Sequence, residues 1–258
     1  MEEPPIQFRV LGCYGAREPG CNLASFLING SLLVEAGSAA STLTIDEQAR
    51  LSGIVLTHAH LDHVAEIPYL ADNIFGKREG PLPIISVKSV LEDLHKHIFN
   101  NVIWPDFTAI SSGNSTVLKF VPLKEGEEHR VGDIRLTAHP VSHKVRAVGY
   151  IFRDRSGSLL YTGDTGPTEA IWQRGHELSD LRAIITEVSF PNKLQDLAEV
   201  AKHLTPATLY EELGKMPPGV PVYLFHEKAQ FREELLSELN ALGDSRLRFL
   251  VQGETYEF

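Results

Sequence analysis

Short apolar runs separated by turn residues dominate the first part of the chain. Three runs of strand length cover residues 6–11, 25–28 and 31–34. The last two are separated by Asn29 and Gly30, and an Asn-Gly pair between apolar runs is a strong signal for a β-hairpin. A fourth strand, at residues 53–57, leads into a group of histidines, and residues 64–73 then repeat apolar positions at helical spacing.

The rest of the chain alternates between the two periodicities. The predicted strands cover residues 84–87, 117–122, 134–140, 147–153, 158–162, 183–186, 222–225 and 247–251. The predicted helices cover residues 90–97, 167–174, 195–202 and 206–215, and a last one carries Phe231, Leu235, Leu236 and Leu239. This order predicts an α/β protein with two packed sheets and helices outside them, in a single domain of residues 1–258.

The composition limits the partners of the protein. No stretch approaches the ~20 apolar residues that a membrane span needs, so no membrane partner is expected. The acidic first residues lack the pattern of a signal peptide, and two cysteines, Cys13 and Cys21, fit neither a disulfide framework nor a zinc motif. A cytoplasmic location with reduced thiols is therefore expected. The net charge of −10 disfavours a long nucleic acid as partner, because binding to one depends on rows of cations.

A dense set of metal-ligand side chains follows the strand at 53–57. The sequence His-x-His-x-Asp-His contains His58, His60, Asp62 and His63. Alternate residues at a strand end point to one side, whereas His63 adjoins Asp62 and points elsewhere, which suits a second ion. Imidazole and carboxylate groups bind zinc, manganese and iron. A solvated histidine-rich loop is the alternative, but the apolar strand before the motif favours a metal site.

Three more ligand-type residues each follow a predicted strand. They are His143, Asp164 and His226. Each one alone is typical of a surface or capping position. Because sheets collect their strand ends along one edge, we expect the three side chains to meet the histidine motif there.

This arrangement resembles the signature of the metallo-β-lactamase fold over nearly the whole chain. Finer matches are similar to class II 3′,5′-cyclic nucleotide phosphodiesterases, above all the segment 101–107 with Asn101, Trp104 and Phe107. Other such matches begin at Tyr161 and Glu187. The resemblance implies a four-layer αβ/βα sandwich with two mixed β-sheets inside and helices outside.

The resemblance also assigns the seven ligand candidates to two divalent metal ions. One ion would take His58, His60 and His143, the other would take Asp62, His63 and His226, and Asp164 would bridge both. Zinc is the expected metal, with manganese or iron as alternatives, and the two ions would share the attacking hydroxide. One departure concerns the usual Asp-x-Gly of the family, where this chain has Glu35-Ala36-Gly37. The extra methylene changes a residue that normally supports the ligands.

Two further residues are candidates for proton transfer. His203 precedes a predicted helix start and would donate to the phosphate or the leaving oxygen, since histidine titrates near neutral pH. Glu187 ends a strand and would accept the other N–H of His203. A capping histidine and a surface carboxylate are the alternatives.

Three residues are candidates for contact with a base. Asn101, Trp104 and Phe107, together with His203, would form the substrate-binding set, because aromatic rings stack on bases. Simple packing within a loop is the alternative.

The leading hypothesis is hydrolysis of 3′,5′-cyclic AMP or cyclic GMP to the 5′-monophosphate, with the small cyclic nucleotide as the only partner besides a second copy in a homodimer. Alternatives on the same fold are RNA 3′-end processing and hydrolysis of a thioester or lactam. A non-catalytic metal or nucleotide sensor is a different class. The intact set of seven ligand candidates favours an enzyme over a sensor, and the absence of a basic arm from the sequence disfavours RNA processing.

Overall fold

Two seven-stranded sheets form the centre of the protein in a computed structural model that describes residues 5–258. In spatial order the first sheet contains β16 (Thr255–Glu257), β1 (Gln7–Gly12), β2 (Ser25–Ile28), β3 (Leu32–Val34), β4 (Gly53–Val55), β5 (Leu82–Val87) and β8 (Leu118–Leu123). The second contains β15 (Leu247–Phe249), β14 (Val222–Phe225), β13 (Leu181–Glu187), β12 (Ser158–Tyr161), β11 (Val148–Arg153), β10 (Ile134–Pro140) and β9 (Glu128–Val131). The acidic first residues, Met1 to Pro4, lie outside the described part of the chain.

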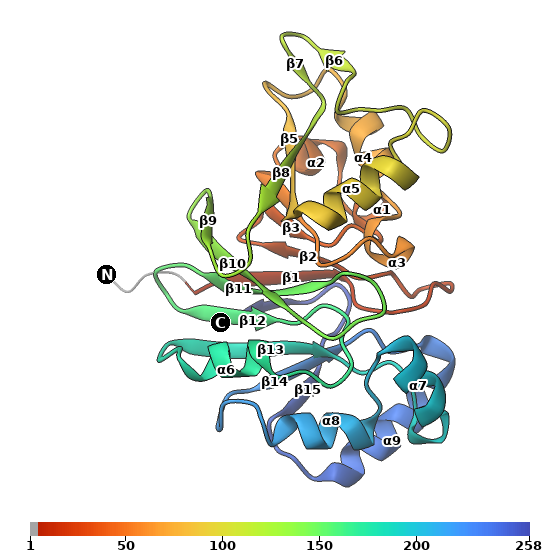
Figure 1. Ribbon diagram of the computed structural model, residues 1–258, viewed down its shortest axis with the longest axis vertical. Coiled ribbons are helices and arrows are strands. Elements are labelled where there is room, and N and C mark those ends of the chain that lie inside the picture. Colours follow the sequence, from red (N-terminus) through yellow and green to blue (C-terminus); the bar gives the residue numbers. More distant parts are fainter. Residues whose placement is uncertain (1–4) are drawn as a thin grey trace.

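Both sheets are mixed and have the same pattern of strand directions. In the first sheet the strands from β16 to β3 pair antiparallel, and those from β3 to β8 pair parallel. The second sheet repeats this pattern, antiparallel from β9 to β12 and parallel from β12 to β15. The last strand, β16, returns from the second half of the chain to pair with β1 (Figure 1).

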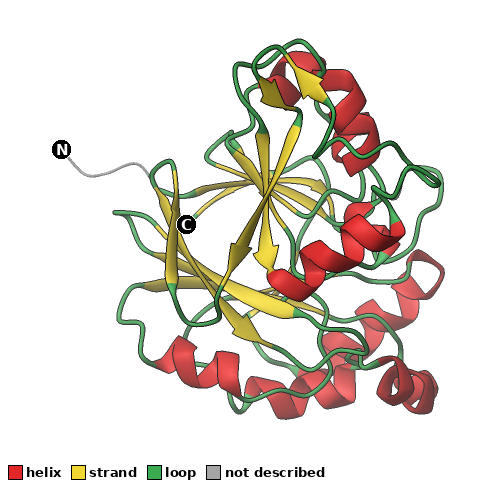
Figure 2. Ribbon diagram, turned by 45° about the horizontal axis from the view of Figure 1, so that its top comes forward, coloured by secondary structure: helices red, strands yellow, loops and turns green. Residues whose placement is uncertain are grey.

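Helices cover the outer faces of the two sheets (Figure 2). The first half contributes α1 (Ala39–Thr42), α2 (Ile45–Ala49), α3 (Leu61–Val64), α4 (Ile67–Ile74) and α5 (Lys88–His97). The second half contributes α6 (Ala170–His176), α7 (Gln195–Ala201), α8 (Pro206–Leu213) and α9 (Arg232–Leu242), with short 3₁₀ helices at Asn192–Leu194 and Ala229–Phe231. The predicted four-layer sandwich is confirmed.

Aromatic rings join the facing sides of the two sheets. The ring of Phe26 in β2 lies 5.7 Å from that of Tyr161 in β12 and 5.5 Å from that of Phe225 in β14, with edge-on geometry in both pairs. All three side chains are fully or almost fully buried. Such edge-to-face pairs fix the distance between the sheets in addition to the hydrophobic effect. Tyr161 and Phe225 end their strands, so this packing also fixes the positions of the residues that follow.

The structure differs from the sequence prediction at residues 64–73, where one helix was expected and two occur. Helix α3 ends at Val64 and α4 begins at Ile67 after Glu66. Pro68 lies in the first turn of α4 and has no N–H to offer to the carbonyl of Val64, so α3 cannot continue. The carboxylate of Glu66 accepts the N–H of Ser41 at 2.8 Å, which holds the break in place.

The sequence prediction also missed several short strands. The strand expected at 247–251 ends at Phe249, and β16 follows after a turn. The two-residue strands β6 (Ser111–Ser112) and β7 (Ser115–Thr116) and the edge strand β9 were not predicted either. Strands of this length carry too few residues to show a periodicity, so pairing with neighbouring strands determines whether they form. Within residues 5–258, no helix has both the length and the apolar character to cross a bilayer.

Candidate metal centre

The strand ends of both sheets bring the predicted ligand residues together at one edge of the sandwich. His58 follows β4, His143 follows β10, Asp164 follows β12 and His226 follows β14. Three groups of ligand-type atoms result, each with all its atoms within 4.8 Å of one another. The third contains Glu187, His203 and His226, and the other two contain the seven ligand candidates. The first group contains His58, His60, His143 and Asp164, and the second contains Asp62, His63, Asp164 and His226. The first two groups have the same members as the two sets expected from the sequence.

Asp164 belongs to both groups and lies between them. Its Oδ1 is 3.3 Å from Nε2 of His63, and its Oδ2 is 3.2 Å from Nε2 of His226. The same Oδ2 is 3.7 Å from Nε2 of His58 in the other group. The side chain is 1% exposed, so water does not compete for its oxygens. This position is the one that a carboxylate bridging two cations requires.

Half of the histidine motif lies in a short helix, which the sequence analysis did not predict. His60 precedes α3 with an extended backbone, and Asp62 and His63 are within that helix. The helical backbone turns the two side chains apart, so that His63 is fully buried while Asp62 remains 26% exposed. A short helix therefore presents Asp62 to the opening and His63 to the interior.

A buried carboxylate supports the ligands of both groups from behind. Glu35 Oε1 accepts the hydroxyl of Thr57 at 2.6 Å and lies 3.5 Å from Nδ1 of His63. Because the Thr57 hydroxyl donates to Glu35, its oxygen is free to accept from Nδ1 of His58 at 2.9 Å. Both histidines then present Nε2 toward Asp164. Glu35 has a φ of 59°, a strained backbone conformation for a residue other than glycine.

The other half of the site has a similar set of supports. Nδ1 of His226 lies 2.9 Å from the hydroxyl of Ser189, and that hydroxyl donates to Oε2 of Glu187 at 2.6 Å. Nδ1 of His143 donates to the carbonyl of Lys202 at 3.1 Å. The sequence analysis missed Ser189. Its spacing could have indicated a role, because Ser189 is two residues after Glu187, just beyond the end of the same strand.

His203 and Glu187 form the contact that the sequence predicted. Nδ1 of His203 lies 2.6 Å from Oε1 of Glu187, and the His203 side chain is 9% exposed. Burial lowers the pKa of His203, but the carboxylates of Glu187 and Asp164 together raise it, and the net pKa is above the usual value. The structure thus favours a protonated His203 that can donate from its remaining nitrogen.

The donor atoms fit divalent cations. Five buried atoms at the centre lack a hydrogen-bond partner among the described residues: Nε2 of His58, both ring nitrogens of His63 and both carboxylate oxygens of Asp164. Buried polar atoms without partners are rare, and metal-ligand atoms are a standard cause. Burial also lowers the pKa of His143 to about 4 and that of His58 well below its usual value, so both imidazoles stay neutral and can bind metal.

The predicted substrate residues lie in the loop after α5, where the structure gives each a different environment. Phe107 is 5% exposed and packs in the core. The side-chain oxygen of Asn101 accepts the N–H of Asp106 at 3.0 Å. Trp104 is partly buried, and its ring meets that of Tyr69 edge-on at 5.3 Å. Trp104 is therefore the member of this set with ring surface left for a ligand.

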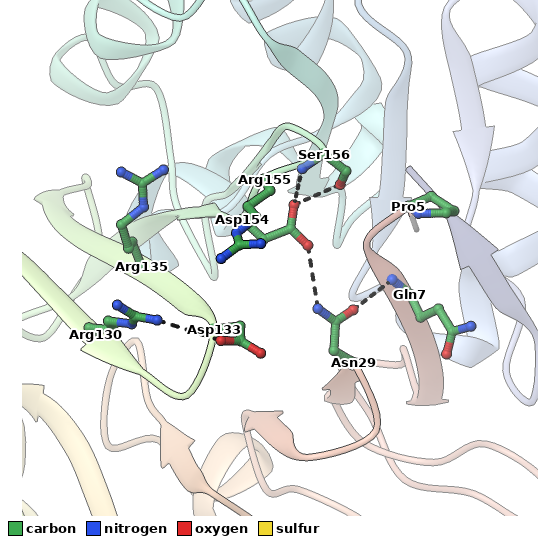
Figure 3. Close-up of a pocket in the computed structure, with 9 residues that line it drawn as sticks. All are labelled: Pro5, Gln7, Asn29, Arg130, Asp133, Arg135, Asp154, Arg155 and Ser156. Atoms are coloured by element: carbon green, nitrogen blue, oxygen red, sulfur yellow. Dashed lines mark hydrogen bonds and ion pairs between the residues drawn. The ribbon is translucent and has the colours of Figure 1, made fainter. Parts of the chain in front are cut away.

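A cavity of about 660 Å³ lies away from the metal centre (Figure 3). It is lined by the turns between strands and by the start of β1, and none of the seven ligand candidates borders it. The side chain of Asn29 crosses it, accepting from the N–H of Gln7 at 2.9 Å and donating to Asp154 at 3.4 Å. Arg130 in the same lining pairs with Asp133 at 3.5 Å. This cavity lacks the chemistry of the metal centre.

Comparisons with known proteins agree with this geometry. A 3′,5′-cyclic-nucleotide phosphodiesterase of Aliivibrio fischeri is 28% identical to the chain and matches 96% of it, over 91% of its own length. A probable 3′,5′-cyclic-nucleotide phosphodiesterase of Yersinia pestis is 27% identical, matching 81% of this chain and 68% of its own. The crystal structure of unliganded yeast PDE1 superposes with a TM-score of 0.81 at 19% identity, covering 99% of this chain and 100% of that one.

The family model adds the most direct result. Residues 25–226 match the model described as the beta-lactamase superfamily domain, and this span includes all seven ligand candidates. The fold, the paired groups of ligand-type residues and this match agree with one another. The chain therefore belongs to the beta-lactamase superfamily and has the metallo-β-lactamase fold.

Proposed function

We propose that this protein is a metal-dependent phosphodiesterase that hydrolyses 3′,5′-cyclic AMP or cyclic GMP to the 5′-monophosphate. The observation that carries the proposal is the combination of two ligand groups bridged by Asp164 with the Glu187–His203 pair beside them. The printed names of the relatives from Aliivibrio fischeri and Yersinia pestis support the choice of substrate. A lone ligand group without a proton donor would support only metal binding.

The proposal assigns the seven ligand candidates to two divalent metal ions, with zinc as the expected metal. The first ion takes His58, His60 and His143, the second takes Asp62, His63 and His226, and Asp164 contacts both. When bound, the ions supply Lewis acidity toward the phosphate and acidify water near neutral pH. The contacts of Nδ1 with Thr57, Ser189 and the Lys202 carbonyl suit this binding, because they orient Nε2 of each ring toward the centre.

His203 has the role of proton donor in this proposal. Opening of the cyclic phosphate leaves a ribose 3′-oxygen that needs a proton. The other nitrogen of His203 is held by Glu187 at 2.6 Å, so the ring is oriented and its protonated form is favoured. Donation of a proton by a positioned histidine contributes about 10²–10⁴-fold to a rate.

A substrate panel with metal-reconstituted protein tests the proposal. The panel contains cyclic AMP, cyclic GMP, bis(p-nitrophenyl) phosphate, a thioester and a lactam. We expect a higher kcat/KM on a cyclic nucleotide than on bis(p-nitrophenyl) phosphate after correction for the leaving group, with 5′-monophosphate as the product. Turnover of the thioester or lactam alone would overturn the proposal, as would a 3′-monophosphate product.

A further inference from the structure

The ammonium group of Lys228 lies against the ring of Phe190 at the edge of the metal centre. Its Nζ is 5.9 Å from the ring centroid, and it donates a hydrogen bond to the carbonyl of Gly15. The backbone N–H of Lys228 also donates to the carbonyl of Ser189 at 3.4 Å. The side chain is thus held at both ends, although lysine is ordinarily among the most mobile residues.

Both neighbours of this ammonium group touch histidines of the site. The ring of Phe190 meets that of His203 edge-on at 5.7 Å. Gly15 lies directly against His226, since a Cβ atom on Gly15 would be 2.6 Å from Cε1 of that imidazole. The missing side chain of Gly15 therefore allows the backbone to approach the site closely enough to hold Lys228 there. The positive charge of Lys228 also lowers the pKa of His203, so the two groups lie close enough to interact.

The charge of Lys228 has no carboxylate to balance it. Across residues 5–258, this lysine forms no ion pair. Two other cations differ from Lys228 in this respect. Arg232 pairs with Glu227, and Lys193, which also lies over a phenylalanine ring, pairs with Glu234 at 2.6 Å. Lys228 is half-buried, and its ammonium group contacts only a neutral carbonyl and an aromatic ring among the described interactions. Its remaining N–H groups can therefore donate hydrogen bonds to an anion.

We propose that Lys228 is a specificity-determining residue that binds a non-bridging phosphate oxygen of the substrate beside His203, with Phe190 holding its aliphatic stem. This inference rests on the proposed function, from which it takes the anionic phosphodiester. The ions held by the ligand candidates would lie on one side of the phosphate and Lys228 on the other. The site thereby selects phosphate esters over neutral esters that lack an anionic oxygen.

The experiment compares Lys228→Met, Lys228→Arg and the matched control Lys193→Met in metal-reconstituted protein. Methionine keeps the stem over the ring and removes only the charge. We measure KM and kcat for cyclic AMP and for bis(p-nitrophenyl) phosphate, binding of inorganic phosphate by calorimetry, bound metal and the melting temperature. Lys228→Met should raise KM and weaken phosphate binding about 10–100-fold, as expected for a lost hydrogen bond to a charged group. Lys228→Arg should recover most of this loss, while Lys193→Met stays within about twofold of wild type.

Two results overturn the inference. One is phosphate binding by Lys228→Met equal to that of Lys193→Met at equal metal content. The other is an equal loss in Lys228→Arg and Lys228→Met, which would indicate a packing role for lysine itself. Failure of wild type to hydrolyse both cyclic AMP and cyclic GMP would overturn the proposed function instead, and phosphate binding then decides the role of Lys228 by itself.

Discussion

Glu187 Oε1 lies 2.6 Å from Nδ1 of His203, and this contact connects the proposed proton donor to the candidate metal centre. The other oxygen of Glu187 accepts the hydroxyl of Ser189 at 2.6 Å, and that hydroxyl contacts Nδ1 of His226. One carboxylate therefore orients a candidate general acid and a candidate metal ligand together. Its side chain is fully buried at the end of β13, where the sheet holds it rigidly.

Glu187→Gln should separate these two effects. The amide keeps the shape of the side chain but removes the charge that raises the pKa of His203. We expect kcat for a cyclic nucleotide to fall about 10–100-fold, since residues that orient an active group typically have effects of this size. His203→Ala should fall further, by about 10²–10⁴-fold. Steady-state kinetics at fixed metal content check this order, and an unchanged kcat in His203→Ala would remove its catalytic role.

Asp164→Ala should lose metal as well as rate. Asp164 lies between the two ligand groups, so its removal leaves six ligands in two incomplete sets. We expect elemental analysis to show two ions per chain in wild type and in His203→Ala, and fewer than two in Asp164→Ala. The rate of Asp164→Ala should be far below that of His203→Ala. A reproducible ceiling of one ion in reconstituted wild type would contradict the bridging role.

Trp104→Ala and Phe107→Ala should behave differently, although both residues lie in the segment that resembles the phosphodiesterases. Trp104 is only partly buried beside Tyr69, so its ring can contact a base. Stacking of a base on an aromatic ring contributes about 1–3 kcal/mol, and Trp104→Ala should weaken cyclic nucleotide turnover by this amount. Turnover of bis(p-nitrophenyl) phosphate, which has no base, should not change. Phe107 is 5% exposed in the core, and its truncation should destabilise the fold by about 3–5 kcal/mol. Thermal unfolding and kinetics with both substrates distinguish the two variants. Equal losses on both substrates in Trp104→Ala would mean that its ring is only packing.

Glu35→Gln should weaken metal binding without unfolding the protein. The carboxylate of Glu35 accepts from Thr57 at 2.6 Å and lies 3.5 Å from His63, so the amide removes charge that polarises ligands of both groups. We expect metal affinity to fall about 10–100-fold in competition with a chelator. Glu47→Gln is the matched control, because Glu47 caps α2 at the surface and should change stability only. Equal affinities in the two variants would show that Glu35 does not support the ligands.

The sequence alone determined which residues are ligand candidates and most of the framework. The hairpin around Asn29 and Gly30 could be predicted because its turn needs two residues with positive φ, which few residues other than Asn and Gly tolerate. In the structure these φ values are 47° and 68°. The ligand candidates could be recognised because they follow apolar strands, either directly or within the His-x-His-x-Asp-His motif, and strand ends meet at one edge. The Glu187–His203 contact was predicted from a strand that ends at Glu187 and a helix that begins after His203.

Only the tertiary structure decided how these parts support one another. Strand β16 forms because it pairs with the edge of β1, and a run of three residues is too short to predict that pairing from its periodicity. Phe107 is buried and Trp104 is only partly buried, since burial depends on how the loop after α5 packs against the core. Lys228 is 213 residues away from Gly15 along the chain, and only folding brings the ammonium to that carbonyl. Local patterns report what a residue can do, whereas contacts between distant segments set which groups it meets.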